Sequence, residues 1–301
     1  MNILLAYHCA SWQRAGYFHD QYFRALGEDI TLFPIEKSAY WTNYYDALPF
    51  YFPKGNPTSV SAIEEQAQKK FDVIIELDGE GQFHLTNPKK VPAILWSMDT
   101  HVPAKRRFQL YFEKEFKTIF SAHKDFIRYF KKVPCQWLPF ACAPQLHKNL
   151  QLPKIYDVVF VGNTNPNVYP ERTRLLQELS REYNVGLFNG KFKEDMVRVL
   201  NQGKIVFNKS FNGDLNMRVF EALGCGSFLL TDVIQNGLFD LFKDGKHLVT
   251  YENERDLKDK VSYYLRHDAE REEIAKNGQK EVLENHTYFQ RAKMILQYLN
   301  Q

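Results

Sequence analysis

The stretch that decides the fold is NKSFNGDLNMRVFEALGCGSFLLTD, residues 208–232. It follows an apolar, strand-like run (204–207) and passes through a turn that contains glycine and aspartate. Residues 215–223 then have the spacing of a short helix, which ends at Gly224, and a second apolar run follows at 227–231. A strand, a helix and a strand in this order are typical of a βαβ unit in a parallel sheet.

Three charged residues of this stretch would share one side of the helix. At 3.6 residues per turn, Asp214, Arg218 and Glu221 fall within an arc of about 60°, opposite an apolar face. The start of a helix that follows a strand is where α/β proteins hold phosphates and ribose hydroxyls. The pattern therefore predicts either such a binding site or a solvated face, whose ion pairs would each add roughly 0.2–0.5 kcal/mol.

In the order of its residues, the stretch resembles the C-terminal half of the CgeB-like glycosyltransferases (spore maturation proteins). These are relatives of the large group-1, family-4-like glycosyltransferases with the GT-B fold. The matching pattern is N-x-S-x-x-G-D-L-N-M-R-V-F-E-A-L-x-C-G-x-x-L-L-T-D. Further pieces agree in order: YDVVFVGN (156–163), YPER (169–172), HLVTY (247–251), REEIAKNG (271–278) and HTY (286–288). In the first half the resemblance is looser and rests on WSMDTH (96–101) and WLPFA (137–141).

The resemblance implies an α/β protein of the GT-B type, in which two Rossmann-like βαβ domains face each other across a cleft. It implies an enzyme that moves a sugar from a nucleotide-diphosphate donor, with UDP or GDP as the expected nucleotide, to a glycan, protein or lipid acceptor. Retention of the anomeric configuration would follow from the same analogy, with the departing phosphate helping to deprotonate the acceptor. No cofactor is implied besides the donor substrate.

The resemblance also implies which residues bind the donor. In the family, the glutamate at the position of Glu221 accepts hydrogen bonds from the ribose hydroxyls. Arg218 would lie near the diphosphate, where a planar guanidinium can bind two oxygens. The broader group has two glutamates separated by seven residues, whereas this chain has Gly213 eight residues before Glu221, with Asp214 beside it. The family pattern is therefore incomplete at its first acidic position.

Strand ends supply the other donor-side candidates, because doubly wound sheets bind ligands at the carboxyl ends of their strands. Gly162 and Asn163 follow the strand expected at 157–161, and Arg172 begins the next expected helix. For Arg172 and Lys209, a solvated surface cation is an equally good interpretation. The full set that we expect to bind the donor is Gly162, Asn163, Arg172, Asn189, Asn208, Lys209, Asn216, Arg218 and Glu221.

Two titratable residues follow the apolar run at 93–97, which predicts a strand. Asp99 and His101 would lie in a carboxyl-end loop, just before a helix that starts at Pro103. Related enzymes place a histidine from such a loop near the donor sugar, so we expect Asp99 or His101 to be catalytic, as a base or as a ligand of a sugar hydroxyl. The alternative is an aspartate that caps the helix and a histidine on the surface. His8, after the first strand, is a weaker candidate of the same kind.

Strand-like runs alternate with helical segments of about ten residues in both halves, which favours parallel βαβ units. We expect an acceptor-side domain at 1–150, a donor domain at 151–285 and a C-terminal helix at 286–301. In the resembled family this helix packs back on the first domain. Strands are expected at 2–7, 30–34, 71–77, 93–97, 118–121 and 136–138, and again at 157–161, 185–188, 205–207, 228–230 and 248–251.

The composition is that of an ordinary globular protein. The chain has 301 residues, enough for two domains, and its formal net charge of +3 gives no electrostatic reason to expect a nucleic-acid partner. The four cysteines include no C-x-x-C pair, which predicts free thiols in a reducing compartment. The N-terminus lacks the features of a signal peptide, and no apolar run is long enough to span a membrane. These features predict a cytoplasmic protein without a transmembrane segment.

Three further patterns concern a dinucleotide cofactor, a membrane contact and a metal ion. Gly79 and Gly81 follow a strand-like run, but position 84 is a histidine, so the fingerprint of NAD-binding proteins is incomplete. The basic helix start at 104–107 is better explained as a solvated helix than as a membrane contact. The chain has no Asp-x-Asp, with which nucleotide-sugar enzymes of the other common fold hold Mg²⁺ or Mn²⁺, and we therefore expect a metal-independent enzyme.

Two rival interpretations stay open. One is a nucleotide-sugar epimerase on the same fold, which would need an acid and a base facing the sugar and no acceptor. The other is a nucleotide- or sugar-binding protein without turnover, which a test for donor hydrolysis or transfer would identify.

Overall fold

The computed structural model describes residues 1–7, 15–34, 58–77, 85–86 and 90–300. The chain forms two compact units, which are described separately: unit 1 comprises Met1–Pro139 and Tyr288–Gln301, and unit 2 comprises Phe140–Thr287. The division expected near 150 and 285 stays a prediction. His8, the loop at 37–57 and the two glycines Gly79 and Gly81 lie outside the described residues.

Unit 1 contains a six-stranded sheet in which every neighbouring pair is parallel. Its four inner strands are mostly apolar and buried, as expected where helices cover both faces of a parallel sheet. In sheet order they are β2 (Asp29–Pro34), β1 (Asn2–Tyr7), β4 (Val73–Leu77), β6 (Ala93–Ser97), β7 (Thr118–Ser121) and β8 (Cys135–Trp137). The other elements are α1 (Ala15–Ala25), α3 (Val60–Ala67), α4 (Pro103–Tyr111), α11 (Tyr288–Leu299), the 3₁₀ turns η2 (Glu113–Glu115) and η3 (Lys124–Tyr129), and a short pair formed by β3 (Thr58–Ser59) and β5 (Leu85–Thr86).

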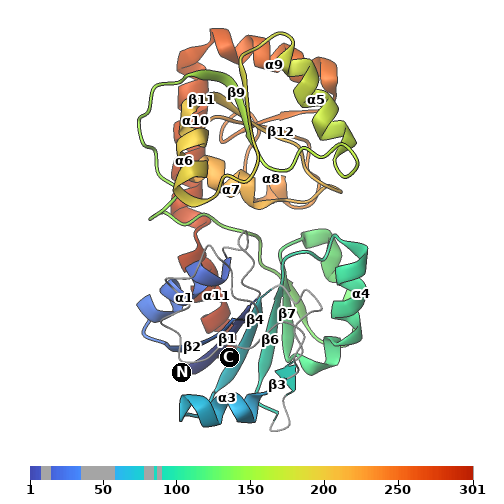
Figure 1. The fold of residues 1–301 in the computed structure, drawn as a ribbon, viewed down its shortest axis with the longest axis vertical. Coiled ribbons are helices and arrows are strands. Elements are labelled where there is room, and N and C mark those ends of the chain that lie inside the picture. Colours follow the sequence, from blue (N-terminus) through green and yellow to red (C-terminus); the bar gives the residue numbers. More distant parts are fainter. Residues whose placement is uncertain (8–14, 35–57, 78–84, 87–89, 301) are drawn as a thin grey trace. The chain divides into compact units, whose positions relative to one another are not determined.

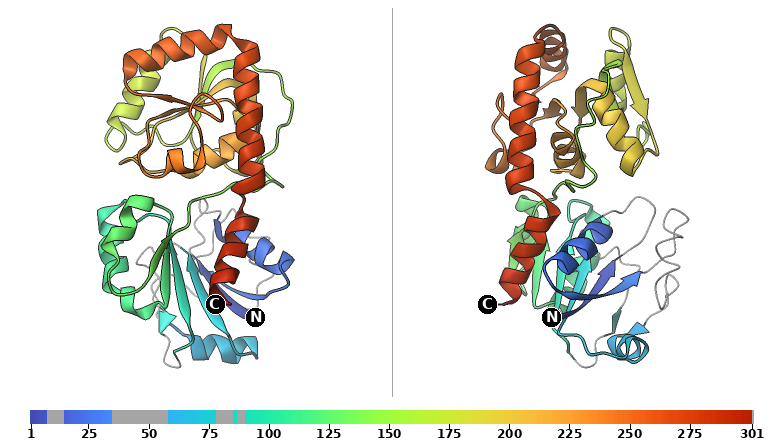
Figure 2. Two further views of the ribbon diagram at one scale, coloured as in Figure 1. Left: turned by 180° about the vertical axis from the view of Figure 1, so that it is seen from behind. Right: turned by 90° about the vertical axis from the view of Figure 1, so that its left-hand side faces the viewer.

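Helices from both ends of the chain complete unit 1. α3 packs on the face of the sheet that carries Leu4 and Ile74. On α11, Tyr288 packs edge-on against Trp96, and Tyr298 packs edge-on against Phe120. α11 also lies beside α1 (Figure 2). α11 is therefore part of the same core as the strands of unit 1, although it follows unit 2 in the sequence.

Unit 2 is an α/β/α layer structure around a five-stranded parallel sheet (Figure 1). Apolar residues of α5 and α9 fill one core with the strands, and α6 and α7 contact the same sheet. In sheet order the strands are β10 (Val185–Phe188), β9 (Tyr156–Val161), β11 (Gly203–Asn208), β12 (Leu229–Asp232) and β13 (Val249–Tyr251). The helices are α5 (Pro170–Ser180), α6 (Lys193–Gln202), α7 (Met217–Gly224), α8 (Leu238–Leu241), α9 (Glu254–Arg266) and α10 (Asp268–Asn285). Both sheets confirm the predicted parallel α/β organisation.

The helix of the opening stretch begins two residues later than its spacing predicts. α7 starts at Met217, after the N-cap residue Asn216, because Asn212 and Gly213 adopt positive φ angles of 53° and 71° and form a turn. Asp214 belongs to this turn, where its carboxylate accepts a hydrogen bond from the backbone nitrogen of Phe211 (2.5 Å). The predicted arc of three charges on one helix was therefore wrong for Asp214 and holds for Arg218 and Glu221.

Two other sequence-based expectations can be compared with the described residues. Cys135, Cys142 and Cys225 are free thiols, as predicted. Among the described helices, none combines the length and the apolar character needed to cross a membrane.

Candidate functional site

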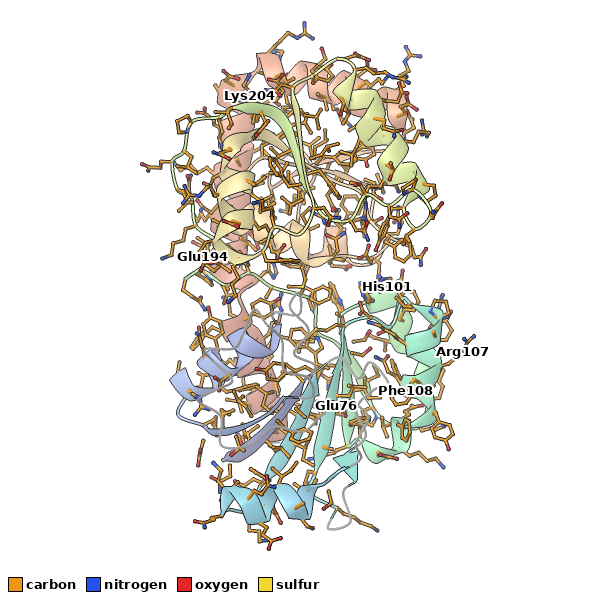
Figure 3. The ribbon with its side chains drawn as sticks, in the orientation of Figure 1. Glu76, His101, Arg107, Phe108, Glu194 and Lys204 are labelled. Atoms are coloured by element: carbon orange, nitrogen blue, oxygen red, sulfur yellow. The ribbon has the colours of Figure 1, made fainter. Side chains whose placement is uncertain are left out.

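The carboxyl ends of the unit 2 strands bring most of the predicted donor-side residues to one edge of the sheet. β9 ends next to Gly162, and its neighbour β11 ends at Asn208. At the opposite, amino end of β11, Lys204 forms an ion pair with Asp157 (2.9 Å; Figure 3 labels Lys204). Strand ends that are remote in sequence thus meet because the strands are parallel and adjacent.

Arg218 is held at this edge by neutral acceptors. Its Nε donates to the carbonyl oxygen of Val161 (2.9 Å), its Nη1 donates to Oδ1 of Asn208 (2.7 Å), and its guanidinium lies 4.5 Å from the centroid of the Phe160 ring. Burial, together with the like charge of Arg172, lowers the pKa of Arg218 to about 10. An anion bound here would relieve both effects.

Arg172 of α5 is a second cation of the same kind. The residue is 7% exposed, and its Nη1 and Nη2 donate to the carbonyl oxygens of Asn163 (3.2 Å) and Lys209 (2.8 Å). Its guanidinium lies 4.1 Å from the centroid of the Tyr169 ring, and its Nε is buried without a hydrogen-bond partner in the described part of the chain. Burial lowers the pKa of Arg172. The two arginines therefore present positive charge that no direct ion pair within the described residues neutralises.

Lys209 lies at the same edge, but its ammonium is already paired. Its Nζ is 3.0 Å from Oδ2 of Asp232 and 3.3 Å from Oε2 of Glu171. Burial alone would lower the pKa of Lys209, but the two carboxylates raise it above its ordinary value. Positive charge available to a ligand at this edge thus comes from the arginines rather than from Lys209.

Glu221 is the acidic counterpart, one turn after Arg218 on α7. It is 7% exposed, yet among the described residues its carboxylate makes no hydrogen bond and no ion pair. Neither carboxylate oxygen is among the enclosed side-chain atoms that lack a partner, so both are accessible acceptors that a bound ligand could use. Asn216 is similar: it does not cap α7 with its side chain, and its Oδ1 is buried without a partner in the described part.

The remaining predicted asparagines differ in their surroundings. Asn208 is fully buried and uses both ends of its amide, accepting from Arg218 and donating to Oγ1 of Thr231 (2.9 Å), so it positions Arg218. Asn163 is exposed, and its Oδ1 accepts from the backbone nitrogen of Asn165 (2.8 Å). Asn189 follows the edge strand β10, is exposed, and makes no side-chain hydrogen bond within the described residues.

Gly162 is required for the close approach of Arg218. Its φ is +151°, and a Cβ at this position would lie 2.5 Å from Nη2 of Arg218. We expect Gly162→Ala to lower the free energy of unfolding by about 1–3 kcal/mol through backbone strain. The clash with Arg218 should add to this loss, because the hydrogen bonds of its guanidinium hold it in place. Gly190→Ala is the matched control, because Gly190 also has a positive φ of +69° but has open space around it. Urea unfolding of both variants measures the difference, and equal losses would show that Arg218 does not restrict position 162.

The residues predicted from the first half lie at the carboxyl edge of the unit 1 sheet, in the loop after β6. Asp99 forms an ion pair with Lys105 of α4, and no side chain caps α4, whose N-cap residue is Val102. His101 is 8% exposed, so it is not a surface histidine. Its Nδ1 lies 3.0 Å from Nε2 of His123, which follows β7 (Figure 3 labels His101). The alternative of a capping aspartate and a surface histidine is therefore wrong.

Several residues of these two edges were not predicted. In unit 2 they are Asp232, which binds Lys209 and the backbone nitrogen of Ser210 (2.8 Å), and Tyr251, whose hydroxyl donates to the carbonyl oxygen of Asn208 (3.2 Å). In unit 1 the residue that was not predicted is His123. The sequence signal that could have identified these three residues is their position, since each stands at or just after the end of a parallel strand.

The chain was compared with known families, curated sequences and solved structures. A family model described as glycosyl transferase-like matches residues 145–297, just over half of the chain. No curated protein sequence matches it.

Solved structures resemble the chain over nearly its whole length. HepE (Alr3699) of Anabaena, solved with UDP-glucose, has a TM-score of 0.71 at 13% identity, covering 100% of this chain and 99% of that one. A sucrose-phosphate synthase of Thermosynechococcus elongatus has a TM-score of 0.67 at 12% identity, covering 99% and 98%. A glycosyltransferase of Rickettsia africae has a TM-score of 0.68 at 9% identity, covering 99% of this chain and 97% of that one. Identities this low establish the fold alone, which is GT-B with two Rossmann-like domains. Together, the family match and the shared fold show that the chain belongs to the glycosyl transferase-like family and is a glycosyltransferase of the GT-B type.

Proposed function

We propose that the chain transfers a sugar from a nucleoside-diphosphate sugar to an acceptor hydroxyl, without a metal ion and with retention of the anomeric configuration. The observation that carries this proposal lies at one edge of the unit 2 sheet, where, among the described residues, two arginines have no carboxylate partner and the carboxylate of Glu221 has no hydrogen-bond donor. A nucleoside diphosphate complements both, because its phosphates are anionic and its ribose hydroxyls are donors.

Each group has a defined task in this proposal. Arg172 and Arg218 bind the diphosphate, and Glu221 accepts hydrogen bonds from the ribose hydroxyls. During transfer the bond between the anomeric carbon and the diphosphate oxygen breaks, and a bond from the same carbon to the acceptor oxygen forms. The acceptor proton passes to the departing phosphate, and the two guanidinium groups stabilise the charge that develops there.

We propose UDP as the first nucleotide to test, because solved structures of HepE, which shares the fold, contain UDP and UDP-glucose. The experiment is a thermal-shift panel of UDP, GDP, CDP and dTDP. A ligand that binds only the native protein stabilises it by about 2.7 kcal/mol at 100 times its Kd. One of the four nucleotides should raise Tm by several degrees, and a flat response to all of them at millimolar concentration would contradict the donor class.

Activity should survive chelation. The cations that face the leaving group are arginines, and the sequence has no Asp-x-Asp with which to hold a divalent ion. Turnover measured with and without EDTA should therefore agree within about twofold, since no step of the proposed mechanism passes through a metal. Loss of turnover in EDTA that Mn²⁺ or Mg²⁺ restores would show that the metal-free mechanism is wrong.

Two finer assignments belong to the same proposal. The ordered motifs between 156 and 288 support the CgeB-like subgroup within the wider family. The acceptor is a glycan, a protein or a lipid, and a mixed acceptor screen with the nucleotide sugar of the best-binding nucleotide identifies its class. The cytoplasmic location stays a prediction from the cysteines and the N-terminus.

A further inference from the structure

One nitrogen atom at the edge of the unit 1 sheet has two close partners. Nε2 of His123 lies 2.7 Å from the carbonyl oxygen of Met98 and 3.0 Å from Nδ1 of His101. The two imidazole rings meet edge to face, with their centroids 4.6 Å apart, and both residues are buried. The positions of the protons in this pair follow from what each partner can donate or accept.

A carbonyl oxygen only accepts, so Nε2 of His123 must carry a proton that points at Met98. His123 itself is neutral, because burial, followed by the proximity of His101, lowers its pKa to about 3. Since Nε2 of His123 is the donor, Nδ1 of His101 has to be the acceptor, and the N–H is shared between the two acceptors. A neutral His101 that accepts at Nδ1 carries its own proton on Nε2.

We propose that His123 is a positioning residue that holds His101 in the Nε2–H tautomer, so that His101 serves as a hydrogen-bond donor rather than as a general base. This inference rests on the proposed function only for the identity of what His101 touches, a sugar or acceptor oxygen. A base would need a free lone pair on Nε2, which this tautomer lacks. Within the loop, the group able to accept a proton or a hydroxyl hydrogen is then the carboxylate of Asp99.

Buried hydroxyl groups keep His123 in place for this task. Oγ of Ser121 donates to the carbonyl oxygen of His123 (2.9 Å) and accepts from its backbone nitrogen (3.2 Å). Thr100 contacts Ser121 (3.3 Å) and Ser97 (2.6 Å), and Ser97 in turn donates to Gln109 of α4 (2.7 Å). The ends of β6 and β7 are thereby cross-linked by a fully buried network, which fixes the geometry of the histidine pair.

The decisive measurement is the nitrogen-15 NMR spectrum of the full-length protein with labelled histidine, because two-bond couplings identify which imidazole nitrogen carries the proton. We expect His101 to show the Nε2–H pattern in the unmodified protein. His123→Gln keeps an amide N–H that can reach Met98 and His101, so it should preserve the tautomer and keep kcat within about threefold. His123→Phe keeps the ring but has no N–H, so it should mix the tautomers and lower kcat by about 10- to 100-fold. The nucleotide Kd should stay unchanged in both variants.

A His101 that carries its proton on Nδ1 in the unmodified protein overturns the inference, and that spectrum requires no variant to fold. Equal tautomers and equal kcat in the phenylalanine and glutamine variants would also overturn it. Failure of the proposed function looks different. In that case the tautomer shifts as expected between the two variants, while His101→Ala retains full turnover.

Discussion

Replacing Glu221 by alanine should weaken the binding of a nucleoside diphosphate by 10- to 100-fold. Glu221 lies on α7, one turn after Arg218, and within the described residues its accessible carboxylate oxygens have no hydrogen-bond donors. Ribose hydroxyls would supply them. Losing a hydrogen bond to a charged group costs about 1.5–3 kcal/mol, which corresponds to this range of affinity.

The same substitution should leave the free protein as stable as before, or more stable. A structural carboxylate would lose its partners on mutation, whereas Glu221 has none of its own to lose in the described part of the chain. Glu194→Ala is the matched control, because Glu194 is an exposed glutamate on α6 of the same unit. Calorimetric titration with UDP, together with urea unfolding, measures both quantities. Unchanged affinity, or a large loss of stability without ligand, would mean that Glu221 is structural.

Replacing Asp99 or His101 by alanine should lower kcat by about 10²- to 10⁴-fold, the range expected when a group that accepts a proton or donates a hydrogen bond in the transition state is removed. Both residues stand in the loop after β6, where His101 is fixed by His123, and Asp99 is the carboxylate of that loop. The nucleotide Kd should change little, because the arginines and the glutamate that we propose bind it belong to unit 2.

Turnover and nucleotide Kd of the two variants have to be measured on the same preparations. His267→Ala provides the control, since His267 is an exposed histidine after α9. Thermal unfolding shows whether the loss of a buried ring has disturbed unit 1. Full turnover in both variants would exclude the loop from catalysis. Loss of nucleotide binding in folded variants would show that the assignment of the donor site to unit 2 is wrong.

Strands were predicted well where an apolar run is bounded by polar or turn residues on both sides. β6, β7 and β10 have the bounds expected from sequence. β6 and β7 are buried throughout, whereas β10 is a partly exposed edge strand whose ends are set by the polar residues around it. Helix ends were predicted less well. The start of α7 depends on a turn in which two residues have positive φ, and the spacing of apolar residues does not reveal this turn.

Individual candidate residues could be named from the sequence, but the side-chain contacts between them could not be predicted. The end of a strand is visible in sequence, so Asn208 and His101 could be chosen as candidates, and Arg218 was chosen from the spacing of its helix and from the family resemblance. Their partners depend on which strands are neighbours. Asp232 reaches Lys209 because β12 lies next to β11, and His123 reaches His101 because β7 lies next to β6. The βαβ pattern at 204–231 predicts that β11 and β12 belong to one sheet, but the sequence contains no signal for which side chains meet at the strand ends.

The place of α11 in unit 1 has a consequence for how the protein is made. Tyr288, Ala292 and Ile295 are fully buried in unit 1, and Nε of Arg291 donates to the carbonyl oxygen of Pro139 (2.8 Å). Unit 1 therefore lacks part of its core until the residues of α11 have been synthesised. Unit 2 is a continuous segment, and all of its residues are synthesised before α11. It can therefore fold while unit 1 still lacks this helix. During synthesis the order of folding is thus the reverse of the order of sequence, and a chain that stops short of residue 288 leaves unit 1, not unit 2, open to aggregation.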